Sequence, residues 1–459
     1  MKKKLLFSIS ILFIFSVCFI SCRHITRLDK ESYEKDREYL KKLLTDCSVD
    51  IAKCIDEGFN IDKLMEEIDN NYKKYENKFD GQEAFGWAIG YSIYKNVPRV
   101  NSHNCIKTAK SYYGTTQHFV PFFSTVYFEK NGDVYTVCES GEKNIKPGMI
   151  YTGEENLLFK TLRDGKEVYR FGLFIDNFMK NASINVGDKY YKIPLKMAES
   201  TANNDADIIS FEKRDDNLFI KLNSCDWHTE KEKDDYEQTF KQIGQLLLDE
   251  KIDNVIIDLR DNSGGYSDVA LWCLYYLLYG KFDNESWEKF IMYERSLDSG
   301  SVSLNSEMLR NVVNLKGRSS NDYGRLLMQN ADKRYVPLFE DVEEVEKPVP
   351  IFNGKIFLIT SRYTASCAEN IILSIKHFFG EKTVILGLNT CGSFDYSDVF
   401  DYFLPESKIA LTLSKADKTT SKLLKNNPDW HGDSRGIYPD YWICFDEDSD
   451  FNRMIECLE

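Results

Sequence analysis

Two similar segments in the second half of the chain constrain its fold more than any other feature. Residues 254–280, "NVIIDLRDNSGGYSDVALWCLYYLLYG", and 354–380, "GKIFLITSRYTASCAENIILSIKHFFG", each have an apolar strand, a polar loop and an apolar helix. Apolar strands that alternate with helices indicate a mainly parallel sheet buried on both faces. Residues 206–459 are therefore expected to form an α/β domain, with any site at the carboxyl ends of its strands, where both loops fall.

The first half of the chain shows two other patterns. Over residues 22–117, segments such as "NIDKLMEEIDNNYKKYENKF" place apolar side chains three to four residues apart, which predicts a helical domain. Over 118–205 the period changes to two, which predicts a small β-rich domain ending in the polar stretch "ESTANNDAD". Residues 287–350 are charged and weakly periodic, which favours an insertion or a lid. The expected fold class is a multi-domain α+β chain.

The first 22 residues, "MKKKLLFSISILFIFSVCFISC", have a basic start, a short apolar core and a small residue before a cysteine. This pattern is typical of a secretory signal peptide over residues 1–21. Its apolar core of about 16 residues is short for a membrane span, which needs roughly 20. "FISC" also resembles the bacterial lipoprotein signal, although Phe19 departs from its usual aliphatic residue. We therefore expect export to the cell envelope and membrane association through a lipid on Cys22, facing the periplasm or the cell surface.

Charge and cysteine spacing exclude several classes of function. The formal net charge of −14 argues against a nucleic-acid partner, because no basic cluster follows the first residues. The twelve cysteines have neither CxxC nor Cys/His metal spacing. The loop "DNSGG" lacks the GKS/T end of a phosphate-binding loop. We expect no metal and no cofactor.

Ser366 begins a Ser-x-x-Glu unit just before an apolar run, and this unit has two interpretations. It is the signature of a helix capping box, in which serine does nothing else. Alternatively, Ser366 is a nucleophile at the helix entrance, where the free N–H of Cys367 would face an oxyanion. The glycines Gly264 and Gly265 allow a second backbone donor to approach closely. The two loops together favour the catalytic interpretation more than either loop does alone.

Four motifs in order resemble the C-terminal processing, or tail-specific, protease family. These motifs are "NVIIDLRDNSGG", "ITSRYTASCAEN", "VILGLNTCGSF" and "GIYPDYWI", and they extend over roughly residues 210–445. The resemblance implies a crotonase-like α/β catalytic domain that cleaves polypeptides. It also implies that Ser366 is the nucleophile in preference to Cys367, with Gly264, Gly265 and Cys367 supplying the oxyanion hole.

The chain departs from this family where the base is expected. The bacterial branch has a lysine after its "TxG" loop, whereas this chain has Ser393 there. The tricorn-like branch takes a histidine from an "SH"-type turn before the protease domain, and "YYGTTQHFVPFF" resembles that setting. The resemblance therefore implies His118 as base and Asp433 as the acid of a Ser-His-acid triad. His431 remains the alternative base, because it lies two residues from Asp433.

The sequence thus predicts an exported serine endopeptidase that acts on polypeptides. The alternative is a catalytically inactive protein of the same fold that binds peptides or apolar ligands at the cell envelope. The sequence does not predict an oligomeric state.

Overall fold

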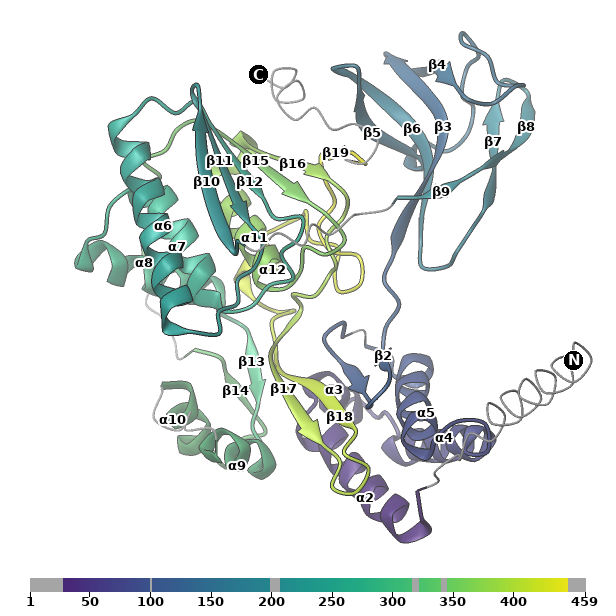
Figure 1. Ribbon diagram of the computed structural model, residues 1–459, viewed down its shortest axis with the longest axis vertical. Helices are drawn as coiled ribbons and strands as arrows, with labels where there is room; N and C mark the ends of the chain where they lie inside the picture. Colours follow the sequence, from purple (N-terminus) through teal and green to yellow (C-terminus); the bar gives the residue numbers. More distant parts are fainter. Residues whose placement is uncertain (1–27, 100, 199–206, 316–321, 340–344, 445–459) are drawn as a thin grey trace, which may run out of the picture.

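The computed structural model describes residues 28–99, 101–198, 207–315, 322–339 and 345–444 (Figure 1). The predicted signal peptide and Cys22 lie outside these ranges. Among the described helices, none has the length and apolar content needed to cross a membrane. The prediction of a mixed α/β chain with several domains is confirmed.

The α/β part is built on a six-stranded sheet in the order β10-β11-β12-β15-β16-β19. The strands from β11 to β19 pair in parallel, and β10 is antiparallel to β11. Their bounds are β10 (Ile209–Arg214), β11 (Asn217–Leu222), β12 (Asn254–Asp258), β15 (Lys355–Thr360), β16 (Thr383–Gly387) and β19 (Tyr441–Trp442).

Helices cover one face of this sheet. Val255, Ile257 and Leu358 point to this face and pack in one buried core with residues of the covering helices. These helices are α6 (Glu230–Asp249), α7 (Ser267–Tyr279), α8 (Asn284–Leu297), α11 (Cys367–Phe379) and α12 (Lys422–Lys425). Because successive strand residues point to opposite faces, the intervening Ile256 and Phe357 belong to a second core on the other side. This double burial explains why the strands are apolar throughout.

A small β region covers part of the second face. Leu162 of this region packs with Ile256 and Phe357 of the large sheet. The region has a sheet in the order β4-β3-β6-β5, with β9 beside β3, and a separate hairpin β7-β8. Its strands are β3 (Val120–Asn131), β4 (Val134–Ser140), β5 (Leu158–Arg163), β6 (Lys166–Ile175), β7 (Asn181–Val186), β8 (Lys189–Pro194) and β9 (Lys196–Met197).

The N-terminal helices pack against a third sheet, whose strands come from three distant parts of the sequence (Figure 1). The helices are α2 (Lys30–Asp46), α3 (Val49–Asp56), α4 (Ile61–Tyr75) and α5 (Gly81–Asn96). The strands are β1 (Cys105–Lys107), β2 (Tyr112–Gly114), β13 (Val302–Leu304), β14 (Tyr335–Pro337), β17 (Tyr396–Phe403) and β18 (Ala410–Asp417). Strand β18 pairs with β1, β13 and β17, and so joins the N-terminal part to the α/β part.

The segment proposed as an insertion or lid contributes to this third sheet. Its strands β13 and β14 pair with each other, and β13 continues the pairing to β18. Helices α9 (Glu307–Leu315) and α10 (Asp322–Gln329) lie between these strands in the sequence. Leu304 and Leu309 are buried in the core of the N-terminal helices, so this segment is an integral part of that core.

Candidate active site

Ser366 lies at the entrance of α11, immediately after the loop that follows β15. Its backbone has φ 53° and ψ −113°, a conformation that residues other than glycine rarely adopt. Such strain costs of order 1–3 kcal/mol and concentrates at functional sites, where the surrounding structure maintains it. The capping box with Glu369 is present, but a simple helix cap has extended backbone angles, so the strain at Ser366 indicates a role beyond capping.

The structure places His103 beside Ser366. The Nε2 atom of His103 is 3.3 Å from Ser366 Oγ, close to the distance expected between a base and its nucleophile. His103 comes from the turn between α5 and β1. Burial and the positive charge of nearby His118 lower the pKa of His103 to about 4. The imidazole is therefore neutral at neutral pH and able to accept a proton.

The sequence-based choice of His118 is revised by this geometry. His118 Nδ1 is 2.8 Å from the carbonyl oxygen of Cys391, so a neutral ring with its proton on Nδ1 donates to the backbone. A closer match to the motif is present in the sequence as "NSHN", because Ser102-His103 is itself an "SH" turn that leads into a strand. The predicted position, Gln117-His118, also precedes a strand but has glutamine in place of the serine.

Two histidines of the α/β part have ring partners other than Ser366. The ring of His431 stacks on Tyr438 with centroids 3.7 Å apart. His377 Nε2 is 2.8 Å from the hydroxyl oxygen of Tyr293. Among the described residues, the histidine hydrogen-bonded to Ser366 is His103.

Asp433 is buried beneath the turn that carries His103. Its Oδ2 accepts a hydrogen bond from the backbone N–H of Ser102 at 3.1 Å. The Ser102 hydroxyl lies 3.1 Å from the same oxygen and 2.6 Å from the Gly392 carbonyl oxygen. The acid therefore holds the neighbour of the base, whereas the sequence predicted that it would hold the imidazole itself. His103 Nδ1 has no hydrogen-bond partner among the described residues. Asp433 thus orients His103 through the Ser102 backbone and hydroxyl.

A second carboxylate, the half-buried Asp395, fixes the position of Asp433. The N–H of Asp395 donates to Asp433 Oδ1, and the N–H of Asp433 donates to Asp395 Oδ2, each at 3.0 Å. Trp430 Nε1 donates to the other oxygen of Asp395 at 2.6 Å. Burial, followed by the charge of Asp395, raises the pKa of Asp433 well above its usual range.

Glu369 joins the Ser366 loop to the loop after β16. Its Oε2 accepts from the N–H groups of Ser366 at 2.9 Å and Ser393 at 2.8 Å. Its Oε1 accepts from the Thr390 hydroxyl and the Gly392 N–H. Burial outweighs these four donors and raises the pKa of Glu369 to about 7. The capping-box pattern predicts that Glu369, the glutamate of the Ser-x-x-Glu unit, caps its helix, and the structure adds this link between two loops.

The glycine loop approaches Ser366 closely. A Cβ atom on Gly264 would lie 2.8 Å from Ser366 Cβ and 3.0 Å from the nitrogen of Cys367, so only glycine fits. The N–H of Gly264 donates to Asn262 Oδ1 at 2.9 Å, so it already has an acceptor within the loop and is not free to bind an oxyanion. Gly265 and Cys367 then supply the candidate oxyanion donors, because Cys367 is the first residue of α11 and its N–H has no acceptor within the helix. The Cys367 thiol donates to the Tyr266 carbonyl oxygen at 3.2 Å.

Comparison with known proteins gives a family for this arrangement. Residues 217–443 match the model of peptidase family S41. No curated protein matches the chain. Among solved structures, mature CPAF complexed with lactacystin is similar at 11% identity and a TM-score of 0.42, over 92% of this chain and 97% of that one. The photosystem II D1 C-terminal processing protease has 12% identity and a TM-score of 0.36, over 94% and 97%.

The tricorn protease is also similar, with 14% identity and a TM-score of 0.35, over 93% of this chain and 37% of that one. The family match covers β11 to β19 and contains Ser366, Glu369, the glycine loop and Asp433. It thereby agrees with the four motifs found in the sequence. Residues 217–443 of this chain belong to peptidase family S41, the family of C-terminal processing proteases.

Proposed function

We propose that the chain is a serine endopeptidase that hydrolyses peptide bonds in polypeptides, with Ser366 as nucleophile and His103 as general base. The observation that carries this proposal is the 3.3 Å contact between His103 Nε2 and the Oγ of a serine with a strained backbone. Membership of family S41 adds support. The catalytic domain would then have the crotonase-like fold that the sequence motifs imply.

In the first half of the reaction, His103 Nε2 accepts the proton of Ser366 Oγ as this oxygen attacks the substrate carbonyl carbon. The resulting oxyanion would face the N–H groups of Cys367 and Gly265, near the positive end of the α11 dipole. His103 then gives its proton to the departing amine. The C–N bond breaks, and an ester on Ser366 remains.

In the second half, water attacks the ester carbon while His103 Nε2 accepts a proton from it. His103 then returns this proton to Ser366 Oγ as the C–O bond breaks and the carboxylic acid product leaves. Each half passes through a charged imidazolium, which burial disfavours. Asp433 holds the ring in place through Ser102, and burial keeps water away from it. His103, Ser102 and Asp433 therefore work as a unit, in which the acid acts on the base through an intermediate residue.

The location of the protein is a further part of this proposal. The basic, apolar and cysteine-ended segment of residues 1–22 supports export and a lipid on Cys22. The protease would then act on polypeptides at the bacterial cell envelope.

Fluorophosphonate labelling of the full chain in detergent tests the catalytic proposal, because such probes react with an activated serine. The variants Ser366→Ala and His103→Ala are compared with His118→Ala, a histidine 2.8 Å from the Cys391 carbonyl oxygen. We expect labelling of the wild type and of His118→Ala, and none of the other two. Loss of labelling in His118→Ala alone would identify His118, and not His103, as the base. A folded wild type that never labels would favour the alternative function, peptide binding without hydrolysis.

A further inference from the structure

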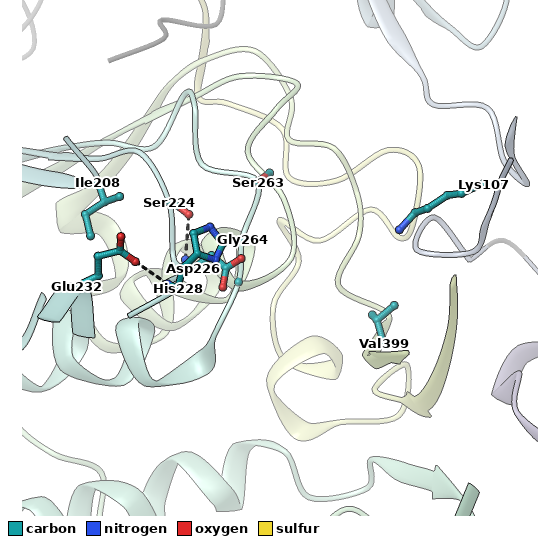
Figure 2. Close-up of a pocket in the computed structure, with 10 residues that line it drawn as sticks. Lys107, Ile208, Ser224, Asp226, His228, Glu232, Ser263, Gly264 and Val399 are labelled. Atoms are coloured by element: carbon teal, nitrogen blue, oxygen red, sulfur yellow. Dashed lines mark hydrogen bonds between the residues drawn. The ribbon is translucent and has the colours of Figure 1, made fainter. Parts of the chain in front are cut away.

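A cavity of about 640 Å³ lies beside the glycine loop of the candidate site (Figure 2). One wall is the loop Ser263–Gly265, and a second is the segment from Ser224 to Glu232 that leads into α6. Lys107 and Val399 lie across the cavity from them (Figure 2). This volume suits one or two side chains of a bound polypeptide.

The segment that forms the second wall is held in register with the glycine loop. The N–H of Cys225 donates to the Gly264 carbonyl oxygen at 3.0 Å, and the N–H of Tyr266 donates to the Cys225 carbonyl oxygen at 2.8 Å. The buried Tyr236 hydroxyl donates to the carbonyl oxygens of Ser224 and Asp226 at 2.8 and 3.1 Å. A side chain on this segment therefore has a fixed position relative to Ser366, as a specificity residue requires.

Asp226 carries a carboxylate on this rigid segment. Its Oδ1 accepts from the N–H of Trp227 at 3.0 Å, and its own N–H donates to Ser224 Oγ at 2.9 Å. These contacts hold the residue in a tight turn. A carboxylate has about four lone-pair sites, so the group can accept further donors from a ligand.

The other charged groups of the lining have partners within the protein. Glu232 Oε2 accepts from the N–H groups of His228 and Thr229, and so caps α6 and offsets its positive end. Lys107 Nζ lies 3.3 Å from Asp401 Oδ1, which offsets the lysine charge. Among the described lining residues, Asp226 is the carboxylate that neither caps a helix nor pairs with a lysine or arginine.

We propose that this cavity binds a basic side chain of the polypeptide substrate and that Asp226 selects it. The inference deepens the proposed peptidase function and rests on it. The apolar side chains of Ile208 and Val399 also line the cavity and suit the methylene stem of lysine or arginine. The net charge of −14 adds a long-range attraction for basic segments.

Cleavage of a random-sequence peptide library by the full chain in detergent, mapped by mass spectrometry, tests the proposal. We expect enrichment of lysine and arginine at one position within about three residues of the cut bond. Asp226→Asn should reduce this enrichment about tenfold, the effect of losing one charge-assisted hydrogen bond. Asp226→Lys should favour aspartate and glutamate there. Glu230→Gln is the matched control, because it removes a charge from the first turn of α6 outside the cavity lining and should leave the enrichment unchanged.

A second measurement does not depend on turnover. Fluorescence anisotropy compares the binding of a lysine peptide and its norleucine counterpart to Ser366→Ala, with and without Asp226→Asn. Ser366→Ala with Asp226 intact should bind the lysine peptide about tenfold more tightly than the norleucine peptide. Equal binding of the two peptides, or a preference that Asp226→Asn does not change, would overturn the proposal even if the enzyme cleaves. If Ser366→Ala prefers the lysine peptide but the wild type never reacts with fluorophosphonate, the cavity assignment stands and the peptidase proposal is refuted.

Discussion

The loop that carries Ser366 and the turn that carries His103 differ in how their positions are determined. Ser366 lies within one strand-loop-helix unit, between β15 and α11, and its neighbour Glu369 is three residues away. His103 reaches the same site because β1 pairs with β18, where Cys105 lies opposite Thr412. The position of the nucleophile is therefore determined by residues close to it in the sequence. The position of the base is determined by the pairing of strands that are far apart in the sequence.

The largest expected effect comes from removing either member of the central pair. Ser366→Ala should abolish peptide hydrolysis, and His103→Ala should lower kcat by about 10²–10⁴-fold, because serine then lacks its proton acceptor. The rate of peptide cleavage under single-turnover conditions measures both. The double variant should lose no more than Ser366→Ala alone, since the two residues act as a unit.

His118→Ala is the control for this prediction. It removes an imidazole that binds the Cys391 carbonyl oxygen, and we expect a change in kcat smaller than that of His103→Ala. If His103→Ala and His118→Ala lost activity equally, the assignment of His103 as the base in preference to His118 would be wrong.

The second prediction concerns the glycine loop. Gly264→Ala should lower kcat by about 10²-fold or more, because a Cβ would lie 2.8 Å from Ser366 Cβ and the φ of +94° is unfavourable for alanine. Gly132→Ala is the matched control, since its φ of +60° carries similar strain but nothing lies within 4 Å of the added atom. Activity assays and thermal unfolding separate the two causes.

Gly132→Ala should destabilise the fold by about 1 kcal/mol and leave kcat unchanged. An active Gly264→Ala enzyme would show that the loop can move away from Ser366. In that case the surrounding loops would hold Ser366 less firmly than its strained backbone indicates.

A third, smaller effect is expected from the acid that supports the base. Asp433→Asn keeps one oxygen that can accept from Ser102 but replaces the other acceptor with an NH2 group that faces the Asp395 N–H, so kcat should fall about 10–100-fold while KM stays similar. Asp395→Asn should cost less, because the Asp395 carboxylate binds the Asp433 main chain and the Trp430 indole, one step further from Ser102 and His103. Equal losses would indicate that the two carboxylates serve only to fold the loop.

The same contrast explains what the sequence could predict. The apolar runs of β12 and β15 and their loops were predicted, because strand and helix periods are visible within each unit. The third sheet is not visible in the sequence, because four of its six strands have only three residues each and because β1 and β13 pair with β18 from distant positions. Ser102-His103 has the serine of the "SH" motif and Gln117-His118 does not, but both precede a strand, and only the long-range pairing of β1 with β18 shows which histidine meets Ser366.

The smallest expected effect is that of pH, and it tests the environment of the base. Only a neutral imidazole can accept the Ser366 proton, and it is neutral above its pKa. With a pKa of about 4, His103 should keep the fluorophosphonate labelling rate within about twofold between pH 8 and pH 5. An exposed histidine with a pKa near 6.5 would lose about 30-fold over this range. Because Glu369 has a pKa of about 7, Glu369→Gln identifies any contribution from that carboxyl group. A fall in the labelling rate near pH 6.5 that persists in Glu369→Gln would mean that His103 is more solvated than its burial in the structure indicates.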